Sequence, residues 1–122
     1  GSVIEWFYDT IAGLKPDAAS PGWKHFHIAP QPGGDLTHAR ATLETPHGLV
    51  ASAWKIADHH FELTATIPPN TTAEIVLPSA NLNSATESGQ PLSSLGAQDL
   101  RVSENRIRLT LPAGIYRFSI PR

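Results

Sequence analysis

Eleven prolines and nine glycines divide this chain of 122 residues into short apolar runs. Residues of these two types favour turns, and the interior of a helix tolerates them poorly. Between them, apolar and polar residues often alternate, as from Phe61 to Ile67, where every second residue is apolar. Alternation with a period of two is typical of a half-buried strand. The sequence therefore predicts a β-rich domain with many turns.

The alternating runs give about eight expected strands, separated by turn signals that contain Pro, Gly or Asp. Strands at this spacing favour an antiparallel β-sandwich or jelly roll, and the chain length fits one such domain. The expected strands share short length and apolar alternation: 23–28, 36–45, 49–56, 60–67, 72–77, 100–102, 107–111 and 115–120, with a further short one at 85–87.

The first residues follow a different period. Apolar residues recur at helical spacing over 2–14, Ser2 and Glu5 stand in capping-box positions, and Gly13 provides a stop signal. We expect an N-terminal α-helix here. Its consecutive aromatic residues at 6–8 point in different directions, and a helix that is apolar on several faces is covered on several faces. We infer that it packs against a larger domain on its N-terminal side.

Composition excludes several classes of partner and chemistry. Nine Lys and Arg against 11 Asp and Glu leave a net charge of −2, which argues against nucleic acid because phosphate binding needs a clustered basic surface. An apolar run long enough to cross a membrane is absent. Without cysteine, the chain has no disulfide, thiolate ligand or nucleophilic thiol. No phosphate loop or nucleophile elbow is present, and we expect no cofactor.

The strand expected at 23–28 presents two different faces. Phe26 and Ile28 are expected on one face, and Trp23, His25 and His27 on the other. Two imidazoles at this spacing could bind one metal ion, as in the cupin metal site. The glutamate that should follow them in that arrangement is absent, so we expect no metal here. The structural alternative has one histidine buried and hydrogen-bonded and the other exposed.

Glu5 is the acidic residue that most suggests chemistry, because it is flanked by Ile4 and Trp6. A carboxyl group in apolar surroundings has a raised pKa and often serves as an acid or base. The structural alternative is a glutamate that caps the first helical turn. The other polar candidates are expected to be solvated charges or turn residues: Glu44, Glu62, Glu74, Glu87, Asp58, Asp99 and the pair His59 and His60.

Several motifs together resemble one known family. The pattern GSV-x-EW-x-Y at 1–8, with IAGL-x-PD at 11–17, resembles the end of the catalytic domain of bacterial α-L-rhamnosidases. PGWKHF at 21–26 and PQPGG-x-LT at 30–37 resemble the start of the C-terminal domain of that family. The resemblance extends over about residues 1–91. Each motif is weak alone, and the combination is specific.

The resemblance implies an inverting glycosidase that removes terminal α-L-rhamnose. Its active site would lie in a helical (α/α)₆ barrel of the same polypeptide, followed by a C-terminal β-sandwich. Residues 1–15 would then be the last barrel helix and residues 16–122 the sandwich. The general acid would lie in the barrel, outside this chain. The partners implied are this barrel and a rhamnose-containing carbohydrate, and the isolated chain would be inactive.

The resemblance also implies two site residues. The family's general base corresponds in position to Glu5. Its sugar-contacting histidine follows the base by about one strand, and His25 lies 20 residues after Glu5. His27 is off the motif and receives no role. Two other interpretations stay open: a non-catalytic carbohydrate-binding or scaffold sandwich with an exposed aromatic platform, and a cupin-like metal domain centred on the two histidines.

Overall fold

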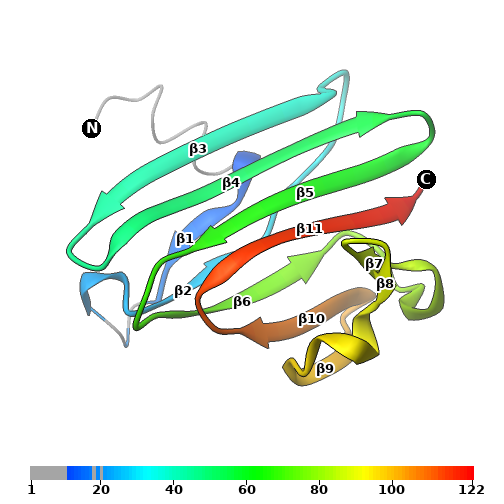
Figure 1. Cartoon of the computed structure of the whole chain (residues 1–122). Coiled ribbons are helices and arrows are strands. Elements are labelled where there is room, and N and C mark those ends of the chain that lie inside the picture. The colour runs from blue at the N-terminus through cyan, green and yellow to red at the C-terminus, as the bar shows by residue number, and fades with distance from the viewer. Residues whose placement is uncertain (1–10, 18, 20) are drawn as a thin grey trace.

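Two facing β-sheets make up the domain (Figure 1). The computed structural model describes residues 11–17, 19 and 21–122. The first sheet has the order β1 (Leu14–Pro16), β2 (His25–Ile28), β6 (Thr72–Leu77), β10 (Arg106–Leu111) and β9 (Gln98–Ser103). The second has the order β3 (His38–Thr45), β4 (Gly48–Ala57), β5 (His60–Ile67), β11 (Gly114–Pro121), β7 (Thr86–Glu87) and β8 (Gln90–Pro91).

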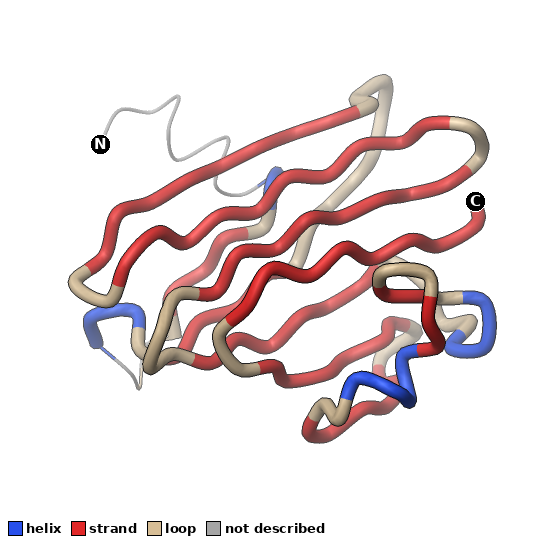
Figure 2. The backbone as a smooth tube through the Cα atoms, viewed as in Figure 1, coloured by secondary structure: helices blue, strands red, loops and turns tan. Residues whose placement is uncertain are grey.

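This architecture confirms the predicted β-sandwich. The count of about eight strands was too low, because the described residues form eleven. The two strands that were not expected, β1 and β8, are only three and two residues long and carry no alternation to detect. Among the described residues, three short 3₁₀ segments lie between strands: η1 (Pro21–Trp23), η2 (Leu82–Ser84) and η3 (Leu92–Leu95). Figure 2 colours the helical segments blue.

Among the strands that the structure describes, pairing is antiparallel with one exception. β2 and β6 run parallel, in a register that places His25 opposite Thr72 and His27 opposite Glu74. A parallel pair needs a long connection, and here the chain passes through β3, β4 and β5 of the second sheet before it returns. This crossover places the two histidines beside Thr72 and Glu74, which lie almost fifty positions further along the chain.

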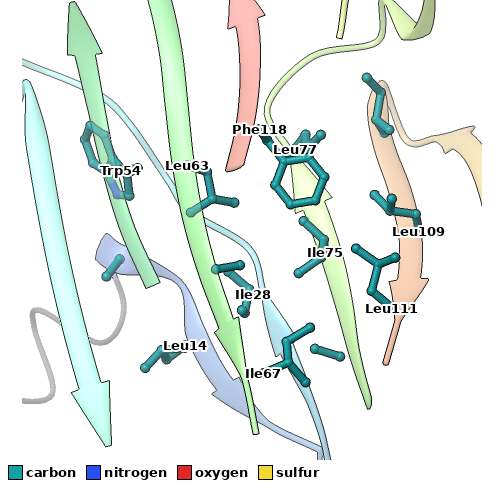
Figure 3. Packing of buried hydrophobic residues seen from close by; sticks show 14 of the residues in the cluster. Leu14, Ile28, Trp54, Leu63, Ile67, Ile75, Leu77, Leu109, Leu111 and Phe118 are labelled. Carbon is teal, nitrogen blue, oxygen red and sulfur yellow. The ribbon is translucent and has the colours of Figure 1, made fainter. Parts of the chain in front are cut away.

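The core lies between the sheets (Figure 3). Burial alternates along β5 and β10, so that Phe61, Leu63 and Ile67 in β5 and Ile107 and Leu109 in β10 are at most 3% exposed. The residues between them face outward. The outward positions of β2 and of the first half of β6 are polar, whereas Val76 in the second half of β6 is apolar and buried.

The expected N-terminal helix falls mostly on residues 1–10, which lie outside the described residues. Ile11 and Ala12 have helical geometry, and Gly13 follows as a turn. The expected last residue of the helix was wrong: Leu14 begins β1 and pairs with Ile28. Gly13 allows the change of direction because its φ is +92°, and a Cβ there would lie 2.3 Å from the carbonyl carbon of Ala29.

Residues 11 and 12 are also held by the second sheet. The Trp54 indole N–H donates to the carbonyl of Ile11 at 3.0 Å, and the Ser52 hydroxyl donates to the carbonyl of Ala12 at 2.7 Å. Ser52 and Ala12 are fully buried. The segment that enters the first sheet is thus fixed to both sheets. None of the helical segments in the described part of the chain is long and apolar enough to cross a bilayer.

Candidate functional site

His25 and His27 lie on the outer face of the first sheet, as their alternation with Phe26 and Ile28 predicts. The strand begins at His25 and not at residue 23, because Trp23 has a positive φ of 64° within η1. The expectation that Trp23 shares the face of the two histidines was wrong, because residue 23 precedes the strand. Its indole packs against the core, with its ring centroid 5.7 Å from that of Phe26.

Each histidine ring is held by a residue of β6. Nδ1 of His25 lies 2.7 Å from the hydroxyl oxygen of Thr72, and Nδ1 of His27 donates to a carboxylate oxygen of Glu74 at 3.2 Å. The two side chains are similarly exposed, at 30% and 32%. The alternative with one buried and one exposed histidine is therefore wrong. Residues two apart on one strand face meet the same environment, which explains the equality.

Asp17, just after β1, brings a carboxylate to the same place. Its Oδ1 accepts a hydrogen bond from the backbone N–H of Ala19 at 2.9 Å. Its Oδ2 lies 3.9 Å from Nε2 of His25 and 3.7 Å from Nε2 of His27. One carboxylate oxygen and two imidazole nitrogens therefore face one another at the edge of the first sheet.

Glu74 was expected to be a solvated charge, and this expectation was wrong. Its side chain is only 18% exposed, and its carboxylate lies 3.4 Å from a guanidinium nitrogen of Arg101 and 3.5 Å from one of Arg108. Together with His27, these arginines make Glu74 the centre of a polar network on the outer face. A groove of about 580 Å³ follows this face, lined by Lys15, His27, Ala29, Glu74, Val76, Glu104, Arg106 and Arg108.

The remaining acidic residues and histidines behave largely as expected. Glu44, Asp58, Asp99 and the pair at 59–60 are exposed. Glu62 pairs with Lys55 across 3.5 Å on the open outer face of the second sheet. Glu87 differs, because its carboxylate accepts from the backbone N–H of Arg117 at 3.0 Å and so fastens β7 to β11.

The predicted general base, Glu5, lies outside the described residues. The predicted sugar contact, His25, is placed by the structure on a half-exposed surface with Nδ1 engaged and Nε2 directed towards Asp17. Nε2 of an imidazole can donate to a hydroxyl group or accept from one, according to the proton it carries. The site is therefore suited to binding polar hydroxylated or ionic ligands.

Sequence reasoning missed Asp17, Thr72 and Glu74 as neighbours of the histidines. Thr72 and Glu74 share the two-residue spacing of His25 and His27, which was the available signal. This signal was not sufficient, because alternation shows which residues share a face of one strand and does not show which other strand pairs with it.

An aromatic platform for sugar stacking is not seen in the described part of the chain. All six aromatic side chains there are buried or half-buried, and the exposed large apolar residues are aliphatic: Leu36, Leu43, Leu49, Val102 and Ile115. A second groove, of about 530 Å³, crosses the outer face of β4, β5 and β11 and includes neither Asp17 nor the two histidines of β2.

Comparison with known proteins agrees with this architecture. The family described as the bacterial alpha-L-rhamnosidase C-terminal domain matches residues 13–91. A protein named alpha-L-rhamnosidase from Formosa agariphila is 38% identical over 97% of this chain, which corresponds to 13% of that protein. A second protein of that name, from Streptomyces avermitilis, is 47% identical over 64% of this chain and 7% of its own length.

A solved structure shows the same fold. The crystal structure of Streptomyces avermitilis alpha-L-rhamnosidase complexed with L-rhamnose superposes with a TM-score of 0.78 and 31% sequence identity. The match covers 94% of this chain and 10% of that one. This chain thus spans about a tenth of the length of the relatives it matches. From its sequence and its fold, the chain belongs to the family of bacterial alpha-L-rhamnosidase C-terminal domains.

Proposed function

We propose that this chain is the C-terminal module of an inverting glycoside hydrolase that removes terminal α-L-rhamnose from rhamnosides. Because Leu14 begins β1, the boundary expected after residue 15 moves to Gly13. Residues 14–122 would form the sandwich, and the residues before them would contribute the last helix of an (α/α)₆ catalytic barrel. The module would be inactive alone. The similarity to alpha-L-rhamnosidases along nearly the whole chain supports the reaction, and the chain's small share of their length supports a barrel elsewhere in the polypeptide.

The observation that carries the proposal is the presentation of His25. Nδ1 of its ring lies 2.7 Å from the Thr72 hydroxyl oxygen, the side chain is 30% exposed on the outer face of the sheet, and Nε2 lies 3.9 Å from Oδ2 of Asp17. A hydrogen bond from this nitrogen to a rhamnose hydroxyl would help to orient the sugar. Because the ring is fixed before the sugar arrives, binding would cost little side-chain entropy.

Glu5 would act as the general base. Its carboxylate would accept a proton from water as the water oxygen forms a bond to the anomeric carbon of rhamnose. The bond from that carbon to the glycosidic oxygen would break at the same time, with the leaving oxygen protonated by a carboxylic acid of the barrel. In inverting enzymes the two carboxyl groups stand about 6.5–9.5 Å apart, which leaves room for this water. The water attacks from the face opposite the leaving group, so the configuration at the anomeric carbon is inverted.

Turnover of an aryl α-L-rhamnoside by the full-length protein tests this proposal. Glu5→Gln should lower kcat about 10²–10⁴-fold, the usual contribution of general acid–base catalysis, with the circular dichroism spectrum unchanged. Glu44→Gln, at an exposed strand position, is the matched control. An unchanged kcat in the Glu5→Gln enzyme would contradict the role of Glu5 as general base. Nuclear magnetic resonance of the first-formed sugar should show the β-anomer, and the α-anomer would contradict inversion.

A further inference from the structure

We propose that the groove on the outer face of the first sheet binds a sugar that carries an anionic group, either a carboxylate or a sulfate ester. The groove has a volume of about 580 Å³. Small-molecule sites typically have volumes of about 300–1,000 Å³. The proposal rests on the proposed function, because the anionic sugar would be the neighbour of the rhamnose that is removed. It names the class of substrate and gives His25 no role beyond its sugar contact.

The groove begins beside the proposed sugar contact. His27 lines it, and the centroid of the His27 ring lies 5.4 Å from that of His25. Two further lining residues, Lys15 and Glu74, stand opposite His27 in the strands on either side of it. A glycan whose terminal rhamnose contacts His25 would therefore place its next sugar over His27, in the groove.

The floor of the groove is apolar and low. Val76 occupies an outward position of β6 but is only 3% exposed, and Ala29 directly follows β2. Charged side chains surround these two residues, among them Arg108, which stands opposite Val76 in register. A pyranose ring has an apolar C–H face and polar substituents at its edge. An apolar floor with polar groups around it therefore suits a sugar.

The charge of this face is opposite to that of the whole chain. Four cationic side chains and two acidic ones gather in the groove or beside it, an excess of two positive charges, whereas the chain has a net charge of −2. They are Lys15, Arg101, Arg106, Arg108, Glu74 and Glu104. A concentrated positive potential attracts an anionic ligand more than a neutral one.

The two acidic residues are already paired, and two of the cations are not. The Glu74 carboxylate lies 3.4 Å from Arg101 and 3.5 Å from Arg108, and Arg108 also lies 3.4 Å from the carboxylate of Glu104. Neither Lys15 nor Arg106 has an ion-pair partner within the described part of the chain. These two cations therefore leave positive charge available to a ligand.

Lys15 and Arg106 approach the groove from different strands. Lys15 belongs to β1 and Arg106 to β10, with β2 and β6 between those strands. The guanidinium group of an arginine can donate two parallel N–H bonds to one carboxylate, and it also binds the oxygens of a sulfate-like group. Arg106 would make this bond, and Lys15 would add a second positive charge near the histidines.

An acidic surface of another domain is the alternative occupant of this face. We favour a sugar because the face is hollow and because the hollow adjoins the proposed rhamnose contact. The alternative predicts that loss of Arg106 changes the stability of the full-length protein and changes no sugar affinity. That result would contradict the proposal.

Calorimetric titration of the full-length protein with methyl glucuronide tests the groove without any rhamnoside. In dilute buffer the wild type should bind methyl glucuronide or glucose 6-sulfate about 3–10-fold more tightly than methyl glucoside, as expected for a charged hydrogen bond at a half-exposed site. The anion that binds more tightly identifies the group. The advantage should shrink from about 0.01 M to about 0.5 M salt.

Variants of the two unpaired cations complete the titration. Arg106→Gln should abolish the preference for the anionic sugar, Lys15→Gln should reduce it, and Arg106→Lys should retain part of it. Arg40→Gln is the matched control, because Arg40 is an exposed arginine on β3 of the other sheet, and it should behave as wild type. Equal affinities for the anionic and neutral sugars in the wild type, or an unchanged preference in Arg106→Gln, would overturn the proposal.

Turnover shows whether the groove serves the proposed reaction. The wild type should have a kcat/KM for a rhamnosyl glucuronate disaccharide about 3–10-fold above that for the matching rhamnosyl glucose, and Arg106→Gln should bring this ratio close to one. Cleavage of an aryl α-L-rhamnoside without any preference for the acidic disaccharide contradicts the groove alone. Glucuronide binding that depends on Arg106, in a protein that cleaves no rhamnoside, contradicts the hydrolase proposal alone.

Discussion

The hydroxyl oxygen of Thr72 lies 2.7 Å from Nδ1 of His25, across the parallel pair formed by β2 and β6. Two strands separated by nearly fifty residues meet here, and the contact fixes the rotation of a half-exposed imidazole. A histidine on an outer sheet face would otherwise sample several rotamers. Thr72 is therefore a positioning residue for the ring that we assign to the sugar.

Thr72→Val should raise KM for an aryl α-L-rhamnoside about 3–10-fold in the full-length protein and leave kcat nearly unchanged. The variant keeps the shape of the side chain and removes one hydrogen bond, which is worth about 0.5–1.5 kcal/mol. Thr72→Ser retains the hydroxyl group and should restore KM. Steady-state kinetics of the two variants measures the difference. A Thr72→Val enzyme with the wild-type KM would show that the ring needs no such support.

Ser52→Ala should destabilise the domain by about 1–3 kcal/mol, because it leaves the buried carbonyl of Ala12 without its partner. Trp54→Phe should act in the same direction, since it removes the indole N–H that binds the carbonyl of Ile11. Urea denaturation gives both values. Ser119→Ala, at a half-buried outer position on β11, is the control and should be within about 0.5 kcal/mol of wild type. Equal stabilities for all three variants would mean that these carbonyls do not anchor residues 11 and 12.

Gly13→Ala should be more damaging than its small size suggests. The added Cβ would lie 2.3 Å from the carbonyl carbon of Ala29, and φ is +92°. Overpacking and left-handed strain together should cost about 2–4 kcal/mol. Gly33→Ala is the matched control, because a Cβ there meets nothing within 4 Å. Thermal denaturation should therefore show a lower Tm for Gly13→Ala and the wild-type Tm for Gly33→Ala. Equal Tm values for the two variants would contradict this packing.

Stability should decline at alkaline pH through Tyr116. Burial, and secondarily the negative charge of Glu87, raises the pKa of the Tyr116 phenol above its ordinary value. The neutral hydroxyl also donates to the carbonyl of Pro112 at 3.0 Å. A raised native pKa means that the contribution is complete below about pH 10, where the unfolded phenol titrates, and is lost as pH rises through the native pKa.

Tm measured from pH 8 to pH 12 checks the tyrosine effect. The wild type should lose more stability above about pH 10 than Tyr116→Phe, which has no proton to release. Tyr116→Phe should be slightly less stable at pH 8, because the hydrogen bond to Pro112 is gone. Parallel curves for the two proteins over the whole range would show that this phenol has the same pKa in the native and unfolded states.

Much of the fold could be predicted from alternation and turn residues. The run at 60–67 coincides with β5, because its apolar residues occupy every second position. The run at 72–77 coincides with β6, because apolar residues dominate it and Pro78 follows it. β1 was missed because Pro16 was interpreted as a helix stop, although it ends a three-residue strand. Such a strand is specified by pairing with β2 and by Gly13, not by its own sequence.

The candidate site was less predictable. His25 and His27 could be assigned to one face from spacing alone. Their partners depend on the parallel pairing of β2 with β6 and on the position of Asp17 after β1. Local sequence does not show which strands become neighbours. The partners of Glu74 were therefore not foreseen, and this residue was interpreted as a solvated charge. The structure shows it bonded to His27 and paired with two arginines.

The most direct test of the account is KM for an aryl α-L-rhamnoside in the His25→Ala variant of the full-length protein. We expect KM to rise about tenfold and kcat to change much less, because the lost hydrogen bond leaves a hydroxyl group of the bound sugar unpaired. The control variant His60→Ala should have the wild-type KM. A His25→Ala enzyme that folds normally and retains the wild-type KM would contradict the claim that this domain contacts the sugar.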